Sequence, residues 1–121
     1  MAYDEDLAAR IRDTIGPDRD LSEQKMFGGL AFLIRGHMAI SASGQGGVLV
    51  RADPARAGEL ITTTAATTAV MGGREMPGWL RVPAADVAGD AELDRWVDLS
   101  VGYARSLPPK KRAAPRPPRA R

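Results

Sequence analysis

The sequence contains no cysteine and only one histidine, His37. The lack of cysteine excludes disulfide bonds, thiolate metal sites and thiol catalysis. A single histidine leaves any metal site short of its usual nitrogen ligands, so we expect neither a metal nor another cofactor. A chain of 121 residues still buries well over half of its unfolded surface, so it can fold as one domain without such a cross-link.

Long hydrophobic runs are also missing. No apolar stretch approaches the roughly 18–20 residues of a membrane-spanning helix. Residues 1–15 form a charged amphipathic segment, which differs from the basic and then apolar pattern of a signal peptide. The sequence therefore predicts a cytoplasmic protein without membrane association.

Acidic residues are absent from the last part of the chain, where basic residues gather. Residues 1–109 hold 11 positive and all 15 negative side chains, which is a net charge of about −4. The remaining positive side chains are Lys110, Lys111, Arg112, Arg116, Arg119 and Arg121. These six residues are candidates for sequence-independent contact with nucleic acid, and a merely solubilising tail is the alternative.

The end of the chain is also poor in large apolar side chains. Residues 109–121 contain none larger than alanine and proline. Such a segment cannot bury enough surface to offset the entropy of ordering it. We therefore predict a folded domain at residues 1–108 and a disordered basic tail at 109–121.

Three segments of the domain have the pattern of helices. Residues 4–15 place apolar side chains at helical spacing after a run of acids, and a Gly-Pro pair follows them. Residues 53–61 begin with Asp-Pro, which suits an N-cap and the first helical position. Residues 90–107 carry one apolar stripe, in which Trp96 is expected to belong to the core.

Five segments have the pattern of strands, namely residues 24–34, 38–43, 48–51, 67–71 and 79–82. Gly28 and Gly29 interrupt the first, which indicates a bulge or the close approach of another backbone. Short turns at 36–37 and 44–47 force antiparallel pairing, and 72–78 is expected to be a loop. The order α-β-β-β-α-β-β-α predicts a two-layer α+β fold with a five-stranded antiparallel sheet and three helices.

Four short blocks resemble the N-terminal domain of the TfoX/Sxy family. They are MFGGLAF at 26–32, GHMA at 36–39, REMPGW at 74–79 and Trp96-Val97 in the last helix. The resemblance extends over roughly residues 4–107. It implies a bacterial, stand-alone domain related to regulators of natural competence, which are thought to act with the cyclic-AMP receptor protein and carry a second, helical domain. No catalytic residues come with the resemblance.

Two function classes follow from these observations. The first is a non-enzymatic interaction or regulatory module with a protein partner, which the basic tail could help onto nucleic acid. The second is a small-molecule or peptide-binding domain with a pocket between the sheet and the last helix. Met76, Trp79 and Arg74 are the candidate residues for such a surface, although core packing is the alternative for Met76 and Trp79.

An enzyme and a homodimer are further readings of the sequence. His37 could act as a general base with a distant acid such as Asp86, but the nucleophile and base of a typical catalytic site are not visible, so we expect no enzyme. A solvent-facing turn residue is the favoured interpretation of His37. An exposed sheet edge could pair across a two-fold axis to form a homodimer.

Overall fold

The computed structural model of the protein describes residues 3–26, 28–71 and 73–108. In chain order, the elements are α1 (Glu5–Ile15), β1 (Leu21–Met26), β2 (Gly29–Ile34), β3 (His37–Ala42), β4 (Val48–Arg51), α2 (Pro54–Thr63), β5 (Thr67–Met71), β6 (Arg74–Val82), the 3-10 helix η1 (Ala84–Val87) and α3 (Asp90–Ser106). None of the described helices is long and apolar enough to cross a membrane.

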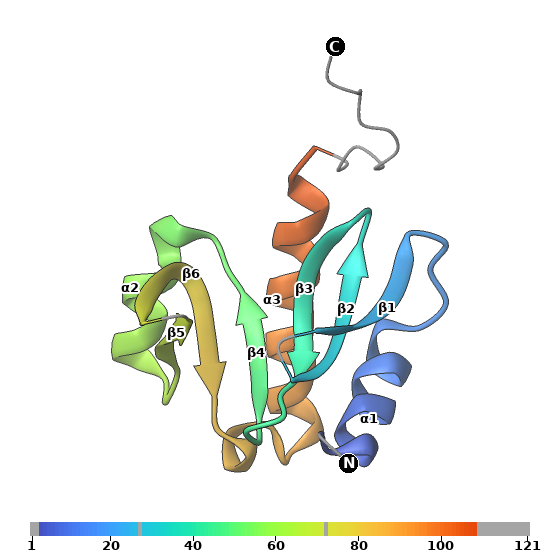
Figure 1. Cartoon of the computed structure of the whole chain (residues 1–121), viewed down its shortest axis with the longest axis horizontal. Helices are drawn as coiled ribbons and strands as arrows, with labels where there is room; N and C mark the ends of the chain where they lie inside the picture. Colours follow the sequence, from blue (N-terminus) through green and yellow to red (C-terminus); the bar gives the residue numbers. More distant parts are fainter. Residues whose placement is uncertain (1–2, 27, 72, 109–121) are drawn as a thin grey trace.

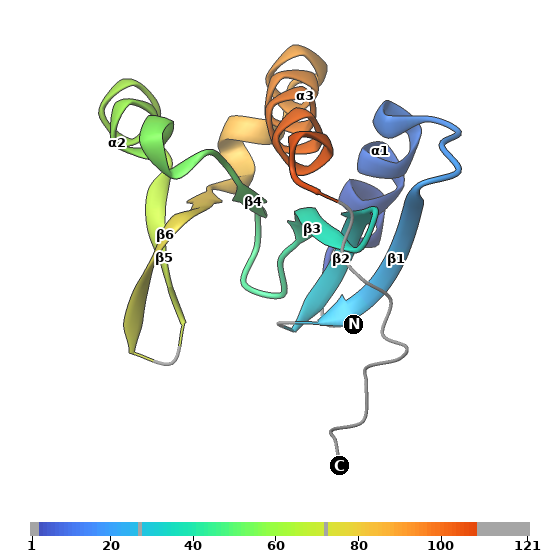
Figure 2. The ribbon, with the colours of Figure 1, turned by 90° about the horizontal axis from the view of Figure 1, so that it is seen from above.

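The strands form one antiparallel sheet in the order β1-β2-β3-β4-β6-β5 (Figure 1). All three α-helices lie on the same face of this sheet, as the view from above shows (Figure 2). The predicted α+β class, the two layers and the antiparallel pairing are therefore confirmed. The predicted number of strands is wrong, because the sheet has six strands rather than five.

The additional strand comes from residues 21–34, which form a hairpin rather than one interrupted strand. Met26 of β1 is the register partner of Gly29 of β2, and Gly28 between them has a φ of 76°, a conformation that glycine adopts without strain. Gly29 is required for a different reason. A Cβ atom at Gly29 would lie 2.1 Å from the carbonyl oxygen of Ala42, so the predicted close backbone approach is present at this residue.

Strand β6 is longer than the sequence predicts. It begins at Arg74 and includes most of the expected 72–78 loop, Pro77 and Gly78 among them. The carbonyl of Gly78 accepts a hydrogen bond of 2.6 Å from the amide of Ala52, just beyond β4, so hydrogen bonding between these two segments continues at the glycine. β5 and β6 consequently form a second hairpin at the far edge of the sheet.

Two further boundaries differ from the prediction. The turn between β2 and β3 consists of Arg35 and Gly36, whose φ angles of 54° and 88° suit a two-residue hairpin, so His37 is the first residue of β3 rather than a turn residue. Helix α2 continues beyond residue 61. The hydroxyls of Thr62 and Thr63 donate to the carbonyl of Glu59 at 2.9 and 2.8 Å and so support the last turn.

The main core lies between the sheet and the helices. Alternate residues of β2, Leu30, Phe32 and Ile34, point toward α1 and α3, because successive side chains of a strand face opposite sides. Their neighbours point to the other face of the sheet, where a second, smaller cluster is buried. That cluster consists of Ala31, Leu33, Met38, Leu49 and Ala69, with Met26 and Trp79 packed against it.

Helix α3 is tied to the α1 side of the domain at both ends. Arg10 of α1 donates to the carboxylate of Asp90 at 3.1 Å and to the carbonyl of Ala88 at 3.2 Å. At the other end, Arg105 pairs with Asp18 in the segment that leads into β1. These contacts fix α3 along its length, and α3 forms one wall of the site described next.

Candidate functional site

A groove runs between α2 and α3 on the helical face of the sheet. It lies where α2 packs on β6 and β5 and α3 packs on β2, β3 and β4, so that the two helices cover neighbouring parts of the sheet (Figure 2). The groove consists of two hollows of about 390 and 360 Å³. Both are lined by Arg56, Leu60 and Leu99, so the two hollows adjoin each other.

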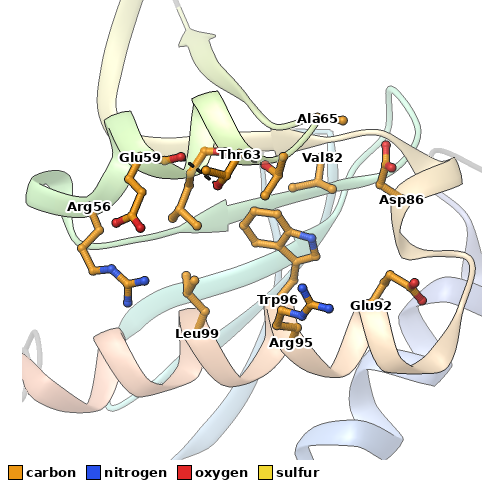
Figure 3. Close-up of a pocket in the computed structure, with 12 residues that line it drawn as sticks. Arg56, Glu59, Thr63, Ala65, Val82, Asp86, Glu92, Arg95, Trp96 and Leu99 are labelled. Atoms are coloured by element: carbon orange, nitrogen blue, oxygen red, sulfur yellow. Dashed lines mark hydrogen bonds between the residues drawn. The ribbon is translucent and has the colours of Figure 1, made fainter.

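The floor of the larger hollow is apolar. Leu60 of α2, Val82 of β6 and Trp96 of α3 are 8%, 2% and 7% exposed, and Leu99 lies half-buried beside them (Figure 3). Trp96 comes from the apolar stripe of the last helix, as predicted, but it borders the groove as well as the core. A burial pattern along one helix cannot separate these two roles.

The rim of the same hollow carries charges of both signs. Arg56 and Glu59 come from α2, Asp86 from η1, and Glu92 and Arg95 from α3. No ion pair joins any of these five side chains to another described residue. Such a rim can form charge-assisted hydrogen bonds with a bound molecule without first breaking a salt bridge.

The second hollow continues the groove toward the C-terminal end of α3. Asp53, Tyr103 and Ser106 line it. Tyr103 contacts Arg51 of β4. The guanidinium carbon of Arg51 lies 5.7 Å from the ring centroid of Tyr103 and 5.2 Å from the ring centroid of Trp79. This stacking links the end of the groove to β4 and β6.

The residues that were predicted to form a partner or ligand surface do not line this groove. Arg74 and Met76 are in the first half of β6, and Arg74 is exposed. Trp79 is half-buried against the second cluster on the opposite face of the sheet. A partner surface at Arg74, Met76 and Trp79 therefore stays a prediction, and it is separate from the groove.

The other candidate site residues from the sequence are the basic residues of the tail and His37. The six basic residues between Lys110 and Arg121 lie outside the described residues. His37 Nε2 lies 2.6 Å from the carbonyl oxygen of Pro108, so its partner is a backbone group rather than a carboxylate. The described residues contain no group of three or more His, Cys, Asp or Glu side chains arranged to hold a metal ion.

Sequence reasoning did not identify the groove residues Arg56, Glu59, Asp86, Glu92 and Arg95. Their only signal is spacing: Arg56 and Glu59, like Glu92 and Arg95, are three residues apart and so share a helix face. That spacing is also typical of an ordinary solvated helix surface. The two faces become one site only because the sheet order places α2 beside α3.

Comparisons with known proteins agree with the blocks noted in the sequence. The family described as the TfoX N-terminal domain matches residues 14–104 of this 121-residue chain. The match begins near the end of α1 and ends in the last turn of α3, so it includes the whole sheet and both walls of the groove. Neither the curated proteins nor the solved structures gave a match. Because the family match spans most of its length, the chain belongs to the TfoX N-terminal domain family.

Proposed function

We propose that this chain is a non-enzymatic interaction and regulatory module that receives a protein partner or ligand in the groove between α2 and α3. The observation that carries the proposal is the groove itself. It combines an apolar floor with a rim of five charged side chains that have no ion-pair partner among the described residues. A concave site that combines apolar side chains with polar groups able to orient a ligand is a common form of binding site.

Membership in the TfoX N-terminal domain family supports a regulatory rather than a catalytic role. In the family that the sequence resembles, such a role is related to natural competence and takes place in the cytoplasm. The sequence also suggested a small-molecule or peptide-binding pocket between the sheet and the last helix, whereas the groove proposed here lies between α2 and α3. The residues that form it are Trp96, Leu99 and Leu60 rather than Met76 and Trp79.

A thermal-shift screen of peptides and metabolites against the full chain tests the proposal. A ligand that binds only the folded state at about 100 times its Kd adds roughly 2.7 kcal/mol to stability and raises Tm accordingly. We expect Leu99→Arg, which places a charge on the groove floor, to abolish the shift. Asp98→Arg is the matched control, because Asp98 is exposed on the same helix and does not line the groove.

A hit that stabilises the parent chain and Leu99→Arg equally would place the binding site elsewhere and contradict the proposal. Circular dichroism and the ligand-free Tm of both variants establish that they are folded.

A second function, contact between the tail and nucleic acid, is proposed from the sequence alone. Six of the residues 110–121 are basic and none is acidic. Without aromatic side chains in this segment, binding would depend on phosphate charge rather than on base identity.

A further inference from the structure

We propose that the end of the groove formed by Trp96, Asp86 and Glu92 binds a lysine or arginine side chain of a peptide segment in a partner protein. This inference rests on the proposed function, because it names the chemistry of the partner that the same groove receives. Three features of this end of the groove carry it: an unpartnered donor, two carboxylates and the balance of charge around them.

The unpartnered donor is the indole N–H of Trp96. The side chain is more than nine-tenths buried, at 7% exposure, yet Nε1 makes no hydrogen bond with any described residue. None of the described residues has a fully buried polar side-chain atom without a partner, so Nε1 retains some accessible surface. Figure 3 shows the nitrogen edge of the ring directed toward the end where Asp86 and Glu92 lie. A buried indole N–H normally finds an acceptor, and a peptide carbonyl can supply one.

The two carboxylates lie at the end of the groove toward which the nitrogen edge of the ring is directed, and neither has a cation of its own among the described residues (Figure 3). Asp86 belongs to η1 and Glu92 to the first turn of α3, and no described basic side chain pairs with either. The Glu92 carboxylate lies against Gly89, where a Cβ atom would come within 2.2 Å of Oε1. Carboxylates next to an aromatic ring suit an ammonium or guanidinium group, which can use both the charge and the ring.

The remaining charges around this end favour a cation that comes on a peptide. Arg95, one turn along α3 from Glu92, opposes an incoming cation, and Arg56 and Glu59 lie on the facing helix. The larger hollow thus has three acids and two arginines, a net charge of −1. The arginines and the indole are all donors. A peptide offers carbonyl acceptors for them as well as a basic side chain, whereas a polyamine offers no acceptor.

The test follows Trp96 fluorescence in the full chain carrying Trp79→Phe, since these two are the only tryptophans. The probes are three blocked pentapeptides, Ac-Leu-Ala-X-Ala-Leu-NH2, in which X is arginine, norleucine or glutamate. We expect a saturable change with the arginine peptide and weaker binding of the other two. The double variant Asp86→Asn/Glu92→Gln should weaken arginine-peptide binding by about tenfold. Arg95→Gln should strengthen that binding, because it removes an opposing positive charge. Asp94→Asn, on the exposed side of α3, is the control and should leave the binding unchanged. The indole N–H resonance of Trp96 in the unsubstituted chain gives an independent readout.

Equal binding of the arginine and norleucine peptides, or arginine-peptide binding that the double variant does not weaken, overturns the cationic specificity. If the norleucine peptide binds in that case and Leu99→Arg abolishes its binding, the proposed function stands without this inference. Failure of all three peptides also overturns the inference, and the thermal-shift screen then judges the proposed function independently. A last control replaces the six basic residues of 110–121 with glutamine and records Trp96 emission without any peptide. If this replacement alone changes the emission, the chain's own tail is the occupant of the groove and the assignment to a partner is overturned.

Discussion

Arg12 and Glu23 form the best-defined ion pair of the domain, between α1 and β1. Nε and Nη2 of Arg12 donate to the two carboxylate oxygens of Glu23 at 2.6 and 2.9 Å. The same guanidinium lies 5.8 Å from the ring centroid of Phe32 in the core. The hydrogen bond from Arg12, with the attraction of its charge, holds the pKa of Glu23 below its usual value despite the opposing effect of burial.

This pair makes a small part of the stability depend on pH. Because the folded-state pKa of Glu23 is lowered, the contribution is present above the unfolded pKa of about 4.3 and is lost as the pH falls through the folded pKa. The two side chains are 46% and 32% exposed, so we expect Glu23→Gln to cost no more than about 1 kcal/mol at pH 7. Urea unfolding at pH 7 and pH 3 measures it, with Glu75→Gln as a control at an exposed residue. A difference that persists undiminished at pH 3 would refute this explanation.

Individual residues of the site were only partly predictable. The position of Trp96 on the buried stripe of the last helix followed from periodicity, and it is 7% exposed. That its nitrogen edge reaches a groove depends on α2, which is distant in sequence. Asp86, Glu59 and Arg56 carried no local signal that separates them from ordinary surface charges.

At the scale of elements, helix starts were predicted better than turns and strand ends. Helix α2 begins where Asp53 accepts a hydrogen bond from the amide of Ala55, which confirms the N-cap predicted from the Asp-Pro pair. The hairpin at Gly28 was not readable, because β1 is mostly polar and exposed and a Gly-Gly pair inside a strand pattern also suits a bulge. A strand through Pro77 and Gly78 contradicts local propensity and depends on pairing with β4.

The contact between Gly29 of β2 and Ala42 of β3 gives a direct test of close backbone packing. Gly29→Ala would place Cβ 2.1 Å from the Ala42 carbonyl oxygen, so we expect a loss of about 1–3 kcal/mol or more as the strands separate. Gly58→Ala is the control, since Gly58 lies in α2 and a Cβ atom added there would meet nothing within 4 Å. It should stabilise the protein by about 0.5–1 kcal/mol. Chemical denaturation of both variants provides the comparison, and a neutral Gly29→Ala would show that the strands do not approach this closely.

At the scale of the whole molecule, the sheet order decides where a site can form. The chain leaves β4, forms α2, places β5 at the outer edge and returns through β6 between them. This crossing sets α2 and α3 side by side on one face (Figure 2). The list of elements in the sequence predicted the fold class, but strand order arises from pairing between distant segments, so the groove between α2 and α3 could not be predicted.

The charge asymmetry of the chain leads to a prediction about nucleic acid. If all six basic residues of 110–121 contact phosphates, the logarithm of the affinity should fall with the logarithm of salt concentration with a slope of about −5. Replacing the six with glutamine in the full chain should abolish this binding in gel-shift titrations at two salt concentrations. If both proteins shift DNA equally, the tail plays no part in nucleic-acid contact.

The central claim is that the α2–α3 groove is the surface by which this family member meets its partner. The most direct measurement is site-specific photo-cross-linking in the native cell, with a benzophenone amino acid at Leu99 on the groove floor or at the neighbouring exposed Asp98. The claim predicts one dominant adduct from position 99 that is absent from position 98 and is lost on Trp96→Ala in a chain that still folds. The same adduct from both positions, or from position 98 alone, would contradict it.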